Sequence, residues 1–581
     1  MPFIRSAGFE NRIYLNLCRT GKQNFECRNR SKTAVFSRNL SSHTRKAAEL
    51  GTLGHQRTVI KNRRFGQQLT HLFSTDSDPA MELEKKNSKF SDSNISEDEI
   101  KLLRDLNELI INEELAKNGS RESKVVEFMH PEDLKEELGL TTPIGNAAAS
   151  YEEILTFFKK FIRLSVHTGN PRFVNQQYAA RDVFGLAGAM LTEAVNTNVH
   201  TYEVGPCYVL LENYMIQKLN RLVGFPEETA DGIFTAGGSL ANMFGFHLAR
   251  IHRYEKMKEK GLVDYPRQIM FTSEECHYSA TKGAAFLGFG TDSCIKVKSD
   301  DHGKMNIHDL ERKIQECINK GDEPLLVNAM CGTTVLGSFD PLDDIADICE
   351  KYNMWLHVDA AWGAACLVSE KHRHLMKGIK RCDSLLWNLH KLMSAPLQCS
   401  AFLVNHKGLL AKTFSTGASY LFQPDKFYDV SYDTGDKTMM CGRKGDVMKL
   451  YTMWKARGDD GMAAIMDKAM DNAQYFLEKI RYREGFKLVM PQFEFTNICF
   501  WYIPSRLRGQ QETEEWWQQI HMVAPKVKER MMKKGSMMIG YQPLAHKNFV
   551  NFFRIIVENP ACTHEDMDFF IKEIDLLGHD L

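Results

Sequence analysis

Residues 355–391, WLHVDAAWGAACLVSEKHRHLMKGIKRCDSLLWNLHK, indicate both the fold class and the positions of candidate functional residues. The stretch opens with a short apolar run that ends in Asp359, which predicts a buried strand presenting a carboxylate at its end. A basic, helix-compatible segment follows, and a second apolar run over residues 384–387 then leads to His390 and Lys391. We therefore expect the acid and the amine at the ends of two strands of one sheet.

This arrangement suits the chemistry of pyridoxal phosphate. The cofactor needs a lysine that holds its aldehyde as a Schiff base and an acid that keeps its pyridine nitrogen protonated. Each unit by which the acid raises the pKa of that nitrogen is worth about 1.4 kcal/mol of differential stabilisation. Lys391 and Asp359 are the candidates. Each residue taken alone also has an ordinary structural explanation. Asp359 could cap a turn, and Lys391 could be a solvated surface lysine.

The motifs HVDAAWG and WNxHK resemble those of the group II pyridoxal-phosphate-dependent amino-acid decarboxylases, and the resemblance runs from about Tyr151 to Leu581. Within that group the chain is similar to the cysteine sulfinate, acidic amino acid and glutamate decarboxylases. The resemblance implies an α/β protein of fold type I, the aspartate-aminotransferase-like fold. It also implies a large domain with a mainly parallel sheet, a small C-terminal α+β domain, and a homodimer with active sites at the subunit boundary.

Four regions are expected along the chain. They are a disordered basic segment (1–85), a helical dimerisation segment (86–200), the large cofactor-binding domain (201–455) and the small domain (456–581). Apolar residues at helical spacing predict amphipathic helices over residues 96–117 and 151–166. The second of these presents Phe157, Phe158 and Phe161 as its apolar face.

The net charge of the chain is zero but unevenly distributed. Residues 1–75 contain ten Arg and four Lys against three Glu, a net charge of +11, so the remaining residues carry −11. An Arg-rich, Ser-rich and acid-poor beginning fits a mitochondrial transit peptide. It also fits a disordered tail ahead of a working start at Met81. We expect a cytoplasmic location, with a mitochondrial one as the alternative.

Several classes of protein are disfavoured by composition. Fourteen cysteines without a CxxC pair, mostly in apolar runs, indicate reduced core thiols. No stretch approaches the roughly 20 apolar residues that span a membrane, and the aromatic residues of the basic segment do not alternate with its charges as in single-strand nucleic-acid binders. A metal-dependent hydrolase that uses His357, Asp359 and His390 lacks a compact spacing such as HExxH, so we expect no metal.

Residues 235–243, TAGGSLANM, lie between a strand-like run and a helix-like run. A glycine-rich turn at a helix start exposes backbone N–H groups to a phosphate. Gly238 and Ser239 match the family's phosphate motif and are candidate contacts, whereas Ala241 stands where the family usually has Ser.

The resemblance supplies the remaining cofactor candidates. It places His277 flat against the cofactor ring, although a lone histidine of this kind is more often structural. It places Thr334 near the ring face and His390 on the phosphate, and Ala361 is a further candidate beside Asp359. Leu389 replaces the proline of WNPHK. A proline would fix φ there, so we expect a modest loosening of the approach of the lysine.

The substrate candidates lie in two distant segments. In the loop NPRFVNQQYAARD, residues 170–182, the resemblance assigns Asn175 and Gln176 to substrate recognition. Tyr178 stands where glutamate decarboxylases have a small hydroxylated residue, so its ring is expected to shorten the pocket, unless it only packs the loop. Arg554 in NFFR matches the family's arginine for the α-carboxylate, a contact that suits a planar fork of donors.

Residues 415–437 form a polar, aromatic stretch that is long enough for a mobile lid. Tyr420 matches the family's loop tyrosine, which protonates the carbanion after carbon dioxide leaves; the alternative is a lid anchor. The expected reaction is decarboxylation of cysteine sulfinate to hypotaurine, which feeds taurine biosynthesis, or of aspartate to β-alanine. Glutamate is the runner-up, and the departures at Leu389 and Ala241 leave an inactive cofactor-binding paralogue as a further alternative.

Overall fold

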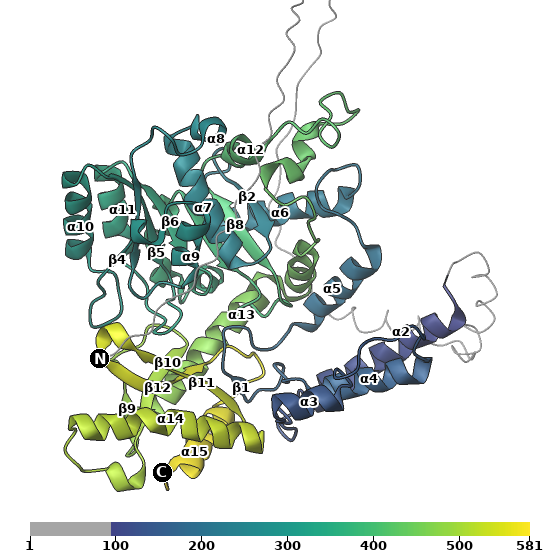
Figure 1. Cartoon of the computed structure of the whole chain (residues 1–581), viewed down its shortest axis with the longest axis vertical. Helices are drawn as coiled ribbons and strands as arrows, with labels where there is room; N and C mark the ends of the chain where they lie inside the picture. Colours follow the sequence, from purple (N-terminus) through teal and green to yellow (C-terminus); the bar gives the residue numbers. More distant parts are fainter. Residues whose placement is uncertain (1–94) are drawn as a thin grey trace, which may run out of the picture. The chain divides into compact units, whose positions relative to one another are not determined.

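The structure, a computed structural model, describes residues 95–581. The transit-peptide prediction and the start at Met81 therefore lie outside the described residues. Two β-sheets with their covering helices, and a group of helices near the start of the described chain, make up this part of the protein (Figure 1).

The larger sheet has seven strands in the order β2-β8-β7-β6-β5-β3-β4. Strands β7, β6, β5, β3 and β4 pair in parallel, whereas β8 is antiparallel to both of its neighbours. The expected α/β fold with a mainly parallel sheet is therefore confirmed. The strand bounds are β2 Asp231–Thr235, β3 Gln268–Ser273, β4 Cys294–Val297, β5 Glu323–Met330, β6 Trp355–Asp359, β7 Ser384–Asn388 and β8 Ser400–Val404.

Both faces of this sheet are buried, which explains the continuous apolar runs of its strands. In β7, Leu385 and Trp387 belong to the core on one face, and Leu386, between them, belongs to the core on the other face. The helices around the sheet are α5 Val183–Val195, α6 Pro206–Val223, α7 Gly238–Arg253, α8 Met257–Lys260, α9 Ser279–Phe286, α10 Ile307–Asn319, α11 Leu342–Lys351 and α12 Leu409–Phe414. Helix α7 packs on the side of Leu386, and α6, α10 and α11 contribute to the opposite core.

The basic segment between β6 and β7 is not the α-helix that its composition allows. It forms three short 3-10 helices, η4 Gly363–Val368, η5 Arg373–Met376 and η6 Ile379–Arg381. In an α-helix Arg373, Lys377 and Arg381 would lie four residues apart on one face, where like charges repel. Gly378, with φ of 91°, separates the last two turns. The segment is helical and connects two strands, as the sequence indicates.

The smaller sheet has the order β1-β11-β12-β10-β9 and is antiparallel except for the β1–β11 pair. Its strands are β1 Phe173–Val174, β9 Phe486–Leu488, β10 Asn497–Tyr502, β11 Met538–Leu544 and β12 Phe549–Ile556, and its helices are α14 Glu514–Lys534 and α15 His564–Gly578. The short strand β1 joins this sheet from far earlier in the chain, so the segment that follows it begins beside β11.

Helix α13, Val447–Arg481, belongs to the cores of both sheets. Gly458, with φ of 67° and ψ of −179°, interrupts its helical backbone. The interruption lies close to the predicted boundary between residues 455 and 456, which is consistent with that boundary. All three domain boundaries remain predictions.

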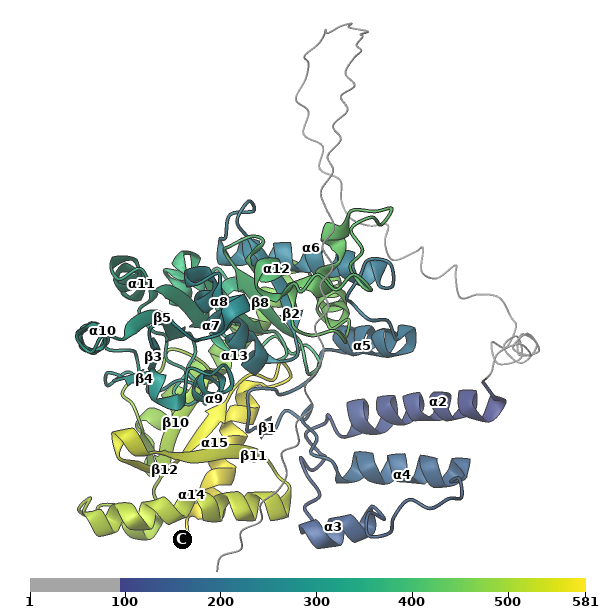
Figure 2. The ribbon, with the colours of Figure 1, turned by 45° about the horizontal axis from the view of Figure 1, so that its top comes forward.

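The helices near the start of the described chain are α2 Glu97–Leu109, the π-helix η2 Ile110–Lys117, α3 Pro131–Glu137 and α4 Tyr151–Leu164. Helices α2 and α4 lie side by side in both views (Figures 1 and 2). The two predicted amphipathic helices are thus confirmed, although the first continues as a π-helix. Ser96 and Ser150 cap α2 and α4 with complete capping boxes.

The predicted apolar face of α4 is largely uncovered within one chain. Leu155 and Leu164 are its buried residues, whereas Phe157 and Phe161 are 39% and 54% exposed. Large apolar side chains in this state are typical of surfaces that bind another protein.

All twelve cysteines within residues 95–581 are free, and nine of them are buried. Cys331, which precedes the candidate Thr334 by three residues, is one of the buried thiols, and burial raises its pKa. Across the same residues, no helix has both the length and the apolar character that crossing a membrane requires.

Candidate cofactor and substrate site

Strands β6 and β7 are parallel neighbours, so their carboxyl ends meet at one edge of the larger sheet. Asp359 ends β6, and Lys391 follows β7 by three residues. Both line one cavity, which the structure forms together with five more of the sequence-predicted residues, Gly238, Ser239, His277, Thr334 and Ala361. Ligands of open α/β sheets bind in crevices at the carboxyl ends of the strands.

The carboxylate of Asp359 is held in one orientation. One oxygen accepts a hydrogen bond from Asn242 Nδ2 at 2.8 Å, and the other accepts from the backbone N–H of Ala361 at 3.2 Å. The amide oxygen of Asn242 lies 2.9 Å from Nε2 of the buried His357. Asn242 was not among the predicted site residues, yet it joins β6 to helix α7 at this point.

His277 belongs to the same network. Its Nδ1 lies 2.7 Å from Ser279 Oγ, which accepts from Asn242 Nδ2 at 3.0 Å. Burial lowers the pKa of His277, which favours the neutral ring. A neutral, fixed imidazole in this cavity can stack on an aromatic ring, as the sequence motif predicts.

Lys391 is the one amine that lines the cavity, and its Nζ donates to Gln177 Oε1 at 3.0 Å. Burial lowers the pKa of Lys391, while the nearby Asp359 and Glu558 raise it in part. A lowered pKa increases the fraction of free amine, the form that attacks an aldehyde.

The start of helix α7 fits a phosphate. Its N-cap, Gly237, has φ of 90°, and no side chain of residues 95–581 caps the first turn, so backbone N–H groups are available. A Cβ at Gly238 would lie 2.7 Å from Asn388 Nδ2. Oδ1 of Asn388 is buried without a hydrogen-bond partner among the described residues. This end of the cavity therefore has room and donors for a phosphate only because residue 238 has no side chain.

Substituting Gly238 with alanine is therefore expected to weaken binding of pyridoxal phosphate by about tenfold or more. The added methyl group either displaces Asn388 or occupies the space of the phosphate, and overpacking of this kind typically costs about 1–3 kcal/mol. Equilibrium titration of apoprotein with the cofactor measures the change.

Gly145→Ala is the matched control, because a Cβ at Gly145 meets no atom within 4 Å and its φ is not positive. It should bind the cofactor as the wild type does. Unchanged affinity in Gly238→Ala would show that the phosphate lies elsewhere.

A guanidinium and a glutamine approach the cavity from the side of the smaller sheet. Arg554 on β12 donates from Nη1 to the carbonyl oxygen of Thr334 at 2.8 Å, and the same oxygen accepts from Gln177 Nε2 at 3.4 Å. Arg554 Nε is buried with no partner among the described residues. Arg554 therefore retains a donor that a carboxylate could use.

The loop after β1 differs in detail from the prediction. Asn175 Oδ1 accepts from Lys528 Nζ at 2.7 Å, and Gln176 is exposed, whereas Gln177 is buried and contacts Lys391. Tyr178 is 36% exposed and packs its ring on Phe173. The sequence analysis missed Gln177 because two adjacent glutamines in a bend cannot be told apart without the backbone.

His390 and Tyr420, like Gln176, Tyr178 and Arg554, are not among the residues that line the cavity. The backbone N–H of Cys399 donates to His390 Nδ1 at 3.0 Å, and burial lowers the pKa of His390 to about 4. Tyr420 is 78% exposed and is not brought to the cavity of its own chain. Leu389, in place of the family's proline, is buried in the core of the larger sheet.

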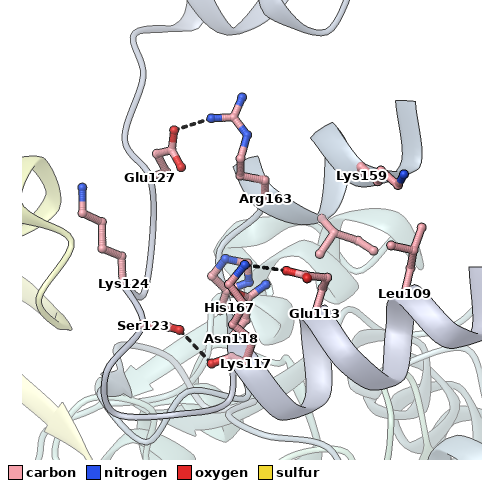
Figure 3. A pocket seen from close by; sticks show the side chains of 11 residues that line it. Leu109, Glu113, Lys117, Asn118, Ser123, Lys124, Glu127, Lys159, Arg163 and His167 are labelled. Carbon is pink, nitrogen blue, oxygen red and sulfur yellow. Dashed lines mark hydrogen bonds and ion pairs between the residues drawn. The ribbon is translucent and has the colours of Figure 1, made fainter. Parts of the chain in front are cut away.

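A second pocket lies between η2, α4 and the segment around Lys124, and Figure 3 shows its side chains. Glu113 pairs with Lys117 on the same helix, and Glu127 pairs with Arg163. The pocket shares no residue with the cavity around Lys391. Lys124 and Lys159 also line it, so its Lys and Arg side chains outnumber its acids.

The histidines of the metal-hydrolase alternative do not form a metal site with Asp359. Both ring nitrogens of His357 have hydrogen-bond partners, Ser384 and Asn242. Within residues 95–581 the only three side chains arranged like metal ligands are Glu274, Glu275 and His546, which lie elsewhere.

The sheet topology, the strand-end lysine and acid, and the glycine-rich helix start together define a fold type I enzyme of pyridoxal phosphate. The comparisons with known proteins agree. Residues 131–503 match the family model of the pyridoxal-dependent decarboxylase conserved domain, and the chain belongs to this family of carboxy-lyases. Its residues fit the cofactor: Lys391 would hold the aldehyde, Asp359 the pyridine nitrogen and the start of α7 the phosphate.

Two curated relatives are similar over most of the chain. The cysteine sulfinic acid decarboxylase of Homo sapiens is 50% identical over 481 residues, which cover 83% of this chain and 96% of the relative. The acidic amino acid decarboxylase GADL1 of Bos taurus is 49% identical over 482 residues, 83% of this chain and 91% of the relative.

Solved structures confirm the fold. A crystal structure of mouse CSAD is 48% identical, covers 83% of this chain and 99% of its own, and has a TM-score of 0.80. A crystal structure of Oryza sativa TDC with PLP and tryptamine is 19% identical, covers 84% of this chain and 99% of its own, with a TM-score of 0.75. The latter supports the fold alone.

Proposed function

We propose that the chain decarboxylates small acidic amino acids, with cysteine sulfinate as the preferred substrate, aspartate as a second one and glutamate as the runner-up. The observation that carries the reaction is the meeting of Lys391 and Asp359 at the ends of β6 and β7, with Arg554 reaching the same cavity through Thr334. The relatives named for cysteine sulfinate and for acidic amino acids support the substrate class. Hypotaurine, the product from cysteine sulfinate, would feed taurine biosynthesis.

Each residue has a role that follows from its chemistry. Pyridoxal phosphate, when bound, supplies the sink for the electrons that carbon dioxide leaves behind. Lys391 Nζ would hold the cofactor through its aldehyde, and Asp359, fixed by Asn242, would keep a proton on the pyridine nitrogen. Arg554 binds the α-carboxylate and orients the bond that breaks, a contact that its buried, unpaired Nε favours.

We further propose a homodimer in which Tyr420 of one chain serves the cavity of its partner. Tyr420 is 78% exposed and does not line the cavity of its own chain, and the uncovered Phe157 and Phe161 of α4 offer an apolar contact surface. From the partner's lid the phenol would return a proton to the α-carbon as a general acid. We propose a cytoplasmic location, with the mitochondrial alternative dependent on residues 1–80.

The size of Tyr178 provides the test of substrate choice. We expect kcat/KM to fall in the order cysteine sulfinate, aspartate, glutamate, and Tyr178→Ser to raise the value for glutamate relative to the sulfinate by about tenfold. One methylene group in a pocket is worth about 10- to 200-fold in selectivity. Carbon dioxide release from the three acids measures both.

Tyr482→Ser is the control, since Tyr482 is 92% exposed at the end of α13. An unchanged ratio in Tyr178→Ser would assign Tyr178 to loop packing. Fastest release from glutamate by the wild type would contradict the proposed preference. A bound cofactor without release from any acid would favour the inactive paralogue.

A further inference from the structure

Glu558 is a buried acid beside the site that the proposed mechanism does not use. It follows β12 by two residues and is 1% exposed. Its Oε1 accepts a hydrogen bond from the backbone N–H of Ala179 at 2.6 Å, in the loop that carries Gln177 and Tyr178. Its Oε2 is buried and has no partner among residues 95–581. A carboxyl group with one free oxygen is thus fixed against the substrate loop.

The charges around Glu558 are those of the active site. Lys391 and Arg554 both act on it, and it acts in turn on both of them. The other titratable groups that feel its charge are the phenol of Tyr178 and the buried thiol of Cys562. Glu558 therefore lies within electrostatic range of Lys391 and of Arg554, the residue proposed to bind the α-carboxylate of the substrate.

We propose that Glu558 sets the charge of the substrate site, so that an acidic amino acid binds well while this carboxyl holds its proton and poorly once the proton is lost. The inference rests on the proposed acidic substrate. Such a substrate brings a second negative group besides its α-carboxylate. A protonated Glu558 leaves the charge of Arg554 available to the substrate, whereas an ionised Glu558 cancels part of that charge and repels the second acid.

The raised pKa of Glu558 supports this dependence of substrate binding on its protonation. Burial raises the pKa of Glu558 well above its usual range, and the amides and cations around it offset only part of that effect. The carboxyl is consequently neutral at low pH and becomes charged as the pH rises through the raised pKa. Affinity for acidic ligands should therefore fall with rising pH, the reverse of what deprotonation of an amino group on the ligand would produce.

The test uses holoenzyme and an unreactive dicarboxylate, succinate, as the probe. We expect its Kd, measured by titration calorimetry, and the KM for the acidic substrate to rise about tenfold or more as the pH rises through the raised pKa of Glu558. Glu558→Gln keeps the acceptor for Ala179 and removes the charge, so both values should stay low and flat. We expect kcat at a given pH to change much less than KM.

Glu573→Gln is the matched control, because Glu573 on α15 is also buried but pairs with Lys534 at the end of α14 and with Ser536. It should keep the wild-type pH dependence. A Glu558→Gln enzyme that retains the wild-type rise, or a wild type without one, overturns the inference.

If Glu558→Gln fails to fold, measurements on the wild type alone still test the inference. Propionate has one carboxylate and should show a smaller rise in Kd with pH than succinate; equal rises overturn the inference. Because succinate binding needs no turnover, an enzyme that rejects all three acidic substrates but binds succinate with the expected pH dependence refutes the proposed function and supports the role of Glu558.

Discussion

Lys391→Ala is expected to lose the cofactor absorption near 420 nm and to lower the rate of carbon dioxide release by about a thousandfold or more. Lys391 is the one amine lining the cavity, so no neighbouring residue can replace its covalent link to the aldehyde. Removing a covalent nucleophile costs several orders of magnitude in enzymes that act through one. The absorption spectrum and kcat are measured on the same preparation.

Two further variants test whether the loss of absorption and activity is due to the missing covalent link. Lys371→Ala removes an exposed lysine from the segment between β6 and β7 and should leave both readings unchanged. Lys391→Arg keeps a positive charge but cannot form the covalent link, and should be as inactive as the alanine variant. Substantial release of carbon dioxide by either Lys391 variant would show that another residue holds the cofactor.

Asp359→Asn is expected to lower kcat by about 100- to 1000-fold while the enzyme still folds. Asparagine can keep the hydrogen bond from Asn242, but it cannot hold a proton on the pyridine nitrogen. A loss of two to three units in the pKa of that nitrogen corresponds to about 3–4 kcal/mol at the transition state, or a factor of ten per unit. Turnover at saturating cofactor separates this effect from weaker binding.

Asp347→Asn is the matched control, since Asp347 forms an exposed ion pair with Arg381 and has no contact with the cavity. It should turn over at the wild-type rate. An Asp359→Asn enzyme that works at the wild-type rate would mean that the ring nitrogen needs no acid.

The parts of the site that lie in one stretch of chain could be predicted from the sequence. One apolar run ends in Asp359 and a second leads to Lys391, and each predicts a strand. Residues 235–243 predict a glycine-rich turn before a helix. In the structure β6 and β7 are neighbours and α7 begins at Gly238, so these residues line one cavity. Apolar periodicity and turn residues are local features of the sequence, which is why these residues could be predicted.

The parts of the site that depend on contacts between distant segments of the chain could not be predicted from the sequence. Ala179 and Glu558 are 379 residues apart and meet only because β1 joins the smaller sheet beside β11. Similarly, whether Gln176 or Gln177 reaches Lys391 is decided by the bend after β1. The segment between β6 and β7 was predicted only to be compatible with a helix, and its composition alone could not show that it forms three short 3-10 helices.

The central claim is that the chain removes the α-carboxylate of an acidic amino acid by means of a cofactor held on Lys391. The direct test is to incubate holoenzyme with aspartate labelled with ¹³C in either its α- or its β-carboxylate and to follow labelled carbon dioxide. We predict release from the α-labelled substrate alone, and none with Lys391→Ala. Release from the β-label, or equal release by the Lys391 variant, would contradict the account.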